Sequence, residues 1–148
     1  MQDRFEMFTI LINRINRNIR KIKNQEMAEY NLRSIHVSCL YYLYMADTLT
    51  ATELCERCDE DKATISRALD FLETNGYLIC QTSNAKRYKS PLTLTDKGVD
   101  VGSKIRDKIN SVFNQIGAEL TDEERQFFYK YLSAISDSLE SVAIHGVK

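Results

Sequence analysis

The chain has 148 residues, of which 43% are hydrophobic and 28% are charged, and its formal net charge is −1. These values suit one domain with a hydrophobic core and exclude a strongly basic protein that coats nucleic acid, while a sequence-specific regulator with local basic patches stays compatible. No apolar run approaches the length of a membrane span, and the residues around Asp3 and Glu6 do not form a signal peptide, so we expect a cytoplasmic protein with no membrane partner.

A long helix is predicted from about residue 3 to residue 29. Its apolar residues recur at alternating steps of three and four, namely Phe5, Phe8, Ile12, Ile15, Ile19 and Ile22. So narrow a seam usually packs against another long helix. The cations around it, from Arg14 to Lys23, form either a solvated face or a surface for DNA phosphates or an acidic helix.

A second helix is predicted from about Ser34 to Ala46, and it is apolar over most of its circumference, as a central buried helix is. Tyr41, Tyr42 and Tyr44 lie within four positions of one another. These tyrosines either pack in the core with their hydroxyls bonded to backbone or solvent, or line a ligand cavity.

Residues 47–50 are predicted to form a turn, after which Thr50 and Glu53 form the capping box of a third helix. Thr52 in its first turn would face a DNA backbone. Cys55 and Cys58 are three residues apart and share one face of this helix. We expect them to pack as small residues; a redox pair and a zinc site are the alternatives, and zinc needs four ligands. No metal and no cofactor are expected.

A fourth helix is predicted to begin after Asp61, its N-cap, and to end before Gly76. The apolar stripe of this helix consists of Ile65, Ala68, Leu69 and Leu72. The residues on the other face and its flanks are Lys62, Ala63, Thr64, Ser66, Arg67, Asp70 and Thr74. Small residues let a helix lie deep in a major groove, and Arg, Lys, Ser and Thr donate to base edges and phosphates. The alternative is an ordinary amphipathic surface helix.

A two-stranded β-wing is predicted at residues 77–82 and 92–94, with the basic residues Lys86, Arg87 and Lys89 near its tip. Pro91 suits the start of such a short strand because it donates no hydrogen bond to a sheet. A basic hairpin can reach a phosphate backbone or a minor groove. We therefore predict a mainly α (α+β) protein of the winged helix-turn-helix class.

Two more helices follow, capped by Thr95 and by a Thr121–Glu124 capping box. Phe127, Phe128, Tyr131, Leu132, Ile135, Leu139 and Val142 form the apolar face of the last one. Because no second core is available for these long helices, we expect them to bury against a second copy of the chain in a two-fold homodimer. The two copies of the fourth helix would then lie about 34 Å apart and match a pseudo-palindromic operator.

The helix-turn-helix with the run from Asp61 to Ile79, the basic wing and the sequence Leu94-Thr95-Asp96-Lys97-Gly98 together resemble the MarR family of bacterial transcriptional regulators. The resemblance covers nearly the whole chain, as a single domain 1–148 with a DNA-binding lobe at 32–95 and dimerisation helices at 1–30 and 96–148. It departs from the family pattern in the wing, where Asn84 stands near the position of an Asp that braces an Arg. Whether Lys86 or Arg87 is the inserted residue therefore stays open.

The resemblance implies a repressor that leaves double-stranded DNA when a small aromatic effector binds. It points to an effector pocket involving Ile12, Ile15, Tyr41, Tyr42 and Tyr44. A thiol-redox-sensing regulator and a winged helix used only for protein–protein contacts are the alternatives. We expect no enzymatic activity, because the sequence has no phosphate-binding glycine-rich loop and neither histidine lies in a catalytic motif.

Overall fold

The computed structural model describes residues 3–80 and 89–148. The chain forms two compact units, Met1–Lys108 and Ile109–Lys148. In both of the described ranges, every helix is too short or too polar to cross a lipid bilayer.

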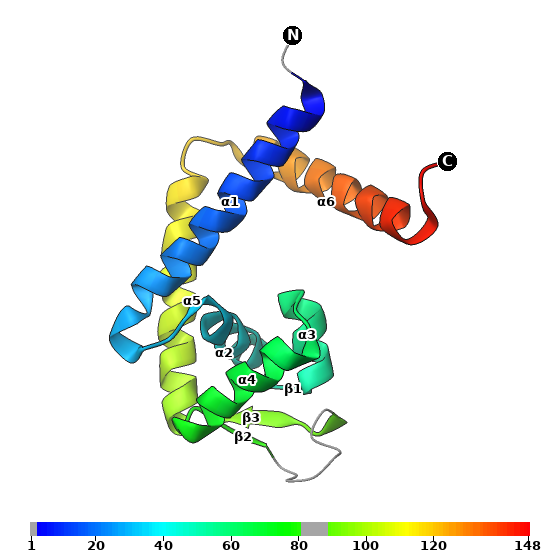
Figure 1. Ribbon diagram of the computed structural model, residues 1–148. Helices are drawn as coiled ribbons and strands as arrows, with labels where there is room; N and C mark the ends of the chain where they lie inside the picture. The colour runs from blue at the N-terminus through cyan, green and yellow to red at the C-terminus, as the bar shows by residue number, and fades with distance from the viewer. Residues whose placement is uncertain (1–2, 81–88) are drawn as a thin grey trace. The chain divides into compact units, whose positions relative to one another are not determined.

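The first unit holds most of the elements drawn in Figure 1. In chain order they are α1 (Arg4–Glu26), the 3-10 turn η1 (Ala28–Tyr30), α2 (Ser34–Ala46), β1 (Thr48–Leu49), α3 (Ala51–Cys58), α4 (Lys62–Thr74), β2 (Leu78–Cys80), β3 (Leu92–Leu94) and the first part of α5 (Asp96–Ile116). The helix predicted to reach residue 29 stops at Glu26, because the chain turns back through Asn31, whose φ of 57° is left-handed. Met27 and Leu32, on either side of this turn, are buried.

The core of the first unit forms around α2, which packs against α1, α3 and α4. Cys39, Leu40 and Leu43 of α2 are fully buried. The predicted stripe of α4 faces this core, since Ile65, Ala68, Leu69 and Leu72 are at most 2% exposed. Figure 1 shows β2 and β3 below α4, and α2 contacts β1 and β3 as well as α4.

The sheet has three antiparallel strands in the order β1-β3-β2 and not two as predicted. Thr48 and Leu49, which we predicted to lie in a turn, pair with Thr93 and Leu92. The Thr48 hydroxyl also donates to the Leu92 carbonyl over 3.2 Å. A two-residue strand is too short to produce a period-two pattern, so only its partner 44 residues away reveals it.

The second unit contains the end of α5 and α6 (Asp122–His145). The predicted capping box of α6 is confirmed: the Glu124 backbone N–H donates to the Thr121 hydroxyl over 3.2 Å, and the Thr121 N–H donates to the Glu124 carboxylate over 2.8 Å. No residue of α6 is buried within the chain. Large apolar residues of α6 are half exposed, among them Phe128 at 49% and Leu139 at 54%.

His36 connects α2 to α4 within the first unit. Its Nδ1 accepts a hydrogen bond from the Arg33 backbone N–H at 3.0 Å. Its ring stacks on Phe71 with centroids 4.2 Å apart, and 8% of the residue is exposed. Burial, with a smaller contribution from the charge of Arg33, lowers the pKa of His36, so the fold favours the neutral imidazole.

We expect the free energy of unfolding to decline in mildly acidic solution because of His36. The unfolded chain takes up a proton near the ordinary histidine pKa of about 6.5, whereas the folded chain takes it up only at lower pH. The contribution of the neutral His36 is therefore complete above this pH and is lost as the pH falls below it. Thermal denaturation measures this effect. When the pH is lowered from about 7.5 to about 5.5, the Tm of His36→Gln should decrease less than the Tm of the unmodified protein. His145→Gln, at the exposed end of α6, is the matched control; an equal decrease in His36→Gln would assign the effect to other groups.

Candidate nucleic-acid interface

The hairpin of α3 and α4 is built by local hydrogen bonds that the sequence predicted. The Thr50 N–H donates to the Glu53 carboxylate over 2.7 Å, and the Glu53 N–H donates to the Thr50 hydroxyl over 3.2 Å. At the turn, Asp59 adopts a left-handed φ of 52°. Asp61 then caps α4 by accepting the Thr64 N–H over 2.7 Å. These caps set the start of both helices and hence which face of α4 points outward.

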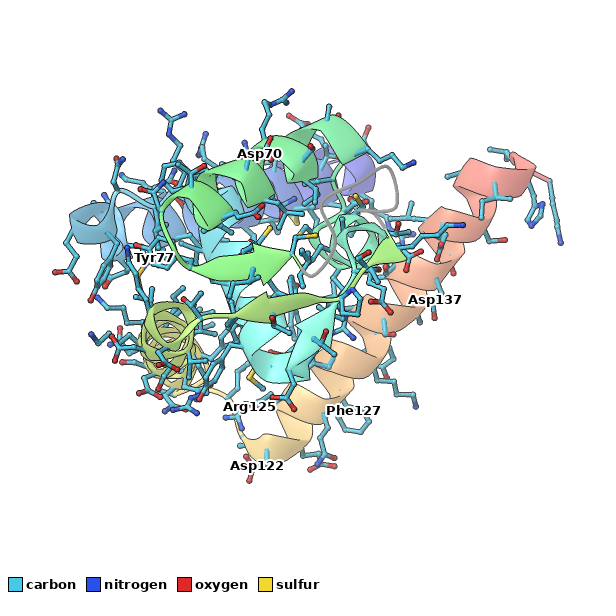
Figure 2. All side chains as sticks on the ribbon, turned by 90° about the horizontal axis from the view of Figure 1, so that it is seen from below. Asp70, Tyr77, Asp122, Arg125, Phe127 and Asp137 are labelled. Atoms are coloured by element: carbon cyan, nitrogen blue, oxygen red, sulfur yellow. The ribbon has the colours of Figure 1, made fainter. Side chains whose placement is uncertain are left out.

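The outward face of α4 carries the predicted DNA-binding residues. Lys62, Ala63, Arg67 and Asp70 are exposed, and Thr64 and Ser66 are half-buried. Figure 2 shows Asp70 on the side of α4 that is turned away from the strands. The Arg67 guanidinium lies along the helix, with Nη2 3.4 Å from the Thr64 hydroxyl. This face therefore combines small side chains with hydroxyl and cationic donors.

The charge at the start of α4 is mixed. Hydrogen bonds from Thr64 lower the pKa of Asp61, and the charge of Arg67 contributes in the same direction. The carboxylate of Asp61 is thus used to cap the helix, where the positive end of the helix dipole favours it. At this end of the helix, the side chains of Lys62 and Arg67 can donate hydrogen bonds to an anion.

The C-terminal end of α4 is held against the start of α5. The Thr95 hydroxyl donates to the Gly76 carbonyl over 2.6 Å, and the Thr95 N–H donates to the Tyr77 carbonyl over 3.0 Å. Lys97 places Nζ 2.7 Å from the Asn75 carbonyl and 4.3 Å from the centre of the Tyr77 ring. Tyr77 is buried at this junction, where Figure 2 labels it.

The wing is described only at its base. β2 and β3 pair from Leu78 opposite Leu94 to Cys80 opposite Leu92. Lys89 is exposed and lies three residues before β3. Lys86 and Arg87, both predicted to contact DNA, lie outside the described residues. Thr52, the predicted phosphate contact, is exposed in the first turn of α3.

The five residues predicted for an effector pocket have different surroundings. The Tyr44 hydroxyl accepts a hydrogen bond from Arg106 Nη1 at 2.9 Å, which ties α2 to α5. Tyr41 and Tyr42 contact each other edge to face, with centroids 5.5 Å apart. Ile12 is half-buried and Ile15 is 49% exposed on α1.

A cavity of about 430 Å³ lies between α1, the start of α2 and the end of α3, and its lining includes none of those five residues. It is lined by Asn16, Ile19, Arg20, Lys23, Asn24, Arg33, Ser34, Ile35, Ser38, Cys58 and Glu60. The cations of α1 were evident in the sequence, but the cavity that they line was not, because α3 approaches α1 only in the folded chain.

Cys55 and Cys58 differ although they share the sequence Cys-x-x-Cys. Burial raises the pKa of Cys55. Cys58 lines the cavity, and a hydrogen bond from Cys39 together with the charge of Lys23 lowers its pKa. Across residues 3–80 and 89–148, the His, Cys, Asp and Glu side chains form no group of three or more that could hold a metal ion.

Comparisons with known proteins agree with this geometry. The MarR family model matches residues 30–87, which include α2, α3, α4 and β2. A helix-turn-helix transcriptional regulator of Bacillus subtilis, the uncharacterised YwoH, is 26% identical over 121 residues, which cover 80% of this chain and 88% of that protein.

Solved structures of MarR family regulators share the fold. NMB1585, a MarR family regulator from Neisseria meningitidis, has a TM-score of 0.84 and 18% identity, with 99% of this chain and 100% of that chain covered. A MarR family transcriptional regulator from Listeria monocytogenes, complexed with a 26mer DNA, has a TM-score of 0.76 and 22% identity, with 100% of this chain and 99% of that chain covered. The predicted mainly α, winged helix fold is confirmed by these likenesses.

Proposed function

We propose that this chain is a transcriptional regulator of the MarR family that binds double-stranded DNA as a homodimer, a proposal supported by the family model match at residues 30–87 and by the shared fold. α4 enters the major groove, and Thr52 and Lys89 contact phosphates on either side of it. The basic residues of the wing, Lys86 and Arg87, extend this contact along the backbone. This role involves no catalysis, and we place the protein in the cytoplasm, where its DNA is.

The observation that carries the proposal is the division of α4 into two faces. Its apolar stripe is at most 2% exposed, so the helix is rigidly held by the core. The opposite face exposes Lys62, Ala63 and Arg67, with Thr64 and Ser66 at the flanks. A helix presented on a packed scaffold, with small residues and donors outward, has the properties needed to read base edges.

The exposed apolar faces of the long helices support the homodimer. Ile15 and Ile19 of α1 are 49% and 43% exposed within one chain, and α6 exposes Phe128 and Leu139. Apolar surface of this extent is rarely left in water on a single chain. A second copy of the chain would cover both faces and place two copies of α4 on one DNA duplex.

We further propose that the protein is a repressor whose operator affinity depends on the spacing of the two α4 helices. Both half-sites must be met at once for tight binding, so a ligand that stabilises a different spacing releases the DNA. The cation-lined cavity between α1, α2 and α3 and the region around Tyr41, Tyr42 and Tyr44 are the two candidate places for such a ligand.

The proposal is tested by the binding of a fluorescent DNA fragment from just upstream of this gene, titrated across a salt series. We expect two chains per binding site, and an affinity that falls with salt at a slope of about −0.9 per phosphate contacted. A fragment of scrambled sequence should bind more weakly at every salt concentration. Absence of binding at low salt, both to this fragment and to genomic DNA offered for selection, would favour a winged helix that contacts only proteins.

A further inference from the structure

Tyr44, in the last turn of α2, is held by two residues of α5. A Cβ on Gly102 would lie 2.9 Å from Tyr44 Cβ and 3.0 Å from its Cδ2, so the glycine lets the base of the tyrosine pack directly onto α5. One turn later, Arg106 Nη1 donates to the Tyr44 hydroxyl over 2.9 Å. These two attachments lie about 6 Å apart along α5, because a helix rises by about 1.5 Å per residue.

The guanidinium of Arg106 is itself fixed by its neighbours on α5. Its Nη2 donates to the Ser103 hydroxyl over 3.3 Å, and its Nε and Nη2 both donate to one carboxylate oxygen of Asp107, over 3.0 Å and 2.8 Å. The guanidinium carbon lies 5.3 Å from the centre of the Tyr44 ring. Because the guanidinium is planar and rigid, these bonds give the Nη1 that reaches Tyr44 a defined direction.

The two attachments oppose movement between α2 and α5. A single contact would allow α2 to pivot on α5, whereas contacts one turn apart resist both pivoting and sliding. α2 packs against α4, so a restraint on α2 also acts on the helix that carries the outward face. α5 continues without interruption beyond Lys108, where the first unit ends. Tyr44 is therefore placed to fix the direction of α5 relative to α4.

Two lysines of α5 make further contacts within the first unit. Lys108 Nζ lies 3.0 Å from the Glu26 carboxylate, and these side chains are 39% and 49% exposed. Lys104 Nζ lies 5.8 Å from the centre of the Tyr30 ring and 2.9 Å from the Asp100 carboxylate of its own helix. Contacts between exposed, flexible side chains contribute little in water. The contact of Arg106 with the tyrosine is therefore the one that we expect to orient the helices.

We propose that Tyr44 and Arg106 are positioning residues, which do not touch DNA but set the orientation of α4 relative to α5 and hence the spacing of the two α4 helices in a homodimer. The effect on DNA rests on the proposed function, whereas the restraint between α2 and α5 does not. When the contact is broken, each α4 keeps its own surface for one half-site. The two copies then meet both half-sites only at the cost of ordering a looser joint.

The test compares a full operator with a fragment that contains one half-site, by fluorescence anisotropy. Arg106→Met should weaken binding to the full operator about tenfold and leave binding to the half-site unchanged. It should also lose less affinity than the unmodified protein when extra base pairs are inserted between the half-sites. A purely structural role would instead weaken the full operator and the half-site in parallel.

Further variants separate the hydrogen bond from other effects of the substitution. Tyr44→Phe keeps the ring on Gly102 but removes the accepting hydroxyl, so it should act in the same direction as Arg106→Met. Combining the two changes should cause no further loss, because both remove one bond. Arg106→Lys, which can still donate to the hydroxyl, should recover part of the affinity. Lys130→Met removes a positive charge from an exposed position of α6 and should change neither fragment.

A measurement without DNA separates this proposal from the proposed function. Spin labels on ketone-bearing amino acids at two exposed positions, Ala63 of α4 and Asn110 of α5, report the distance between these helices and leave the native cysteines unmodified. Dilution with unlabelled protein restricts the signal to pairs within one chain. The distribution of distances should be wider in Arg106→Met than in the unmodified protein and in Lys130→Met.

Equal widths in these three proteins, or parallel losses on the operator and the half-site, would overturn the proposal. If the unmodified protein binds no DNA, the proposed function fails, and the distance distributions alone decide whether Tyr44 and Arg106 restrain the two helices.

Discussion

Replacing Arg67 with alanine is expected to weaken binding to the operator by about 1–3 kcal/mol, or roughly 5- to 150-fold in Kd. The same change should reduce discrimination between the operator and a fragment altered at one base pair of each half-site. Both effects are measured by fluorescence anisotropy titration of the two fragments at one salt concentration.

The size of this effect follows from the position of Arg67 on α4. The residue is exposed, and its guanidinium contacts only another outward residue of the same face, Thr64, among the hydrogen bonds found in the described chain. Its removal therefore leaves the core unchanged. An arginine can donate two parallel hydrogen bonds to a guanine edge, and these bonds are lost together.

Two variants separate base reading from charge. Lys130→Ala removes one positive charge from an exposed position of α6 and should leave discrimination unchanged. Arg67→Lys keeps the charge but not the planar pair of donors, so it should retain part of the affinity and little of the discrimination. Operator binding that is unaffected in Arg67→Ala would mean that another face of the molecule reads the DNA.

Replacing Gly98 with alanine is expected to lower the free energy of unfolding by about 3 kcal/mol, at the upper end of what overpacking usually costs. For a chain of this size that loss corresponds to a decrease in Tm of roughly 6–12 °C. Thermal denaturation followed by circular dichroism measures it directly.

The reason is a clash between the added Cβ and a backbone oxygen, which no side-chain movement relieves. A Cβ on Gly98 would lie 2.0 Å from the Tyr77 carbonyl oxygen and 3.1 Å from Leu94 Cδ2. That carbonyl is held in place by the Thr95 N–H, and the Thr95 hydroxyl also accepts the Gly98 N–H over 3.1 Å. Relief of the clash must therefore separate the start of α5 from the turn between α4 and β2.

Gly117→Ala is the matched control for this substitution. Its Cβ would meet Arg125 Nε at 3.2 Å, the end of a flexible side chain that can move aside. We expect a change in Tm of no more than about 3 °C. A Gly98→Ala protein as stable as the control would show that the junction tolerates separation, and DNA binding should then be unchanged as well.

The contact also explains a short sequence motif that the sequence analysis used only as one part of a family resemblance. In Leu94-Thr95-Asp96-Lys97-Gly98, Thr95 caps α5, Lys97 covers the Tyr77 ring and Gly98 admits the Tyr77 carbonyl. Each of these residues helps to fix the C-terminal end of α4. The motif is thus a structural connection between the outward helix and α5.

The sequence by itself determined the features that depend on neighbours within one or two helical turns. The capping boxes at Thr50 and Thr121 and the cap at Asp61 were predicted and are present, because a cap is made by residues three positions apart. The buried stripe of α4 was predicted for the same reason, since a period of 3.6 residues identifies one face of a helix. These local rules were sufficient to find the helix-turn-helix and its outward residues.

Only the tertiary structure decided the features made by residues distant in the chain. The third strand exists because Thr48 and Leu49 meet β3, and the lowered pKa of the Cys58 thiol depends on Cys39 and Lys23 from two other helices. The cavity has the same origin, because its wall comes from α1, α2 and α3. Patterns along the sequence report which way a side chain points, but its partner across the core is set by how the helices pack.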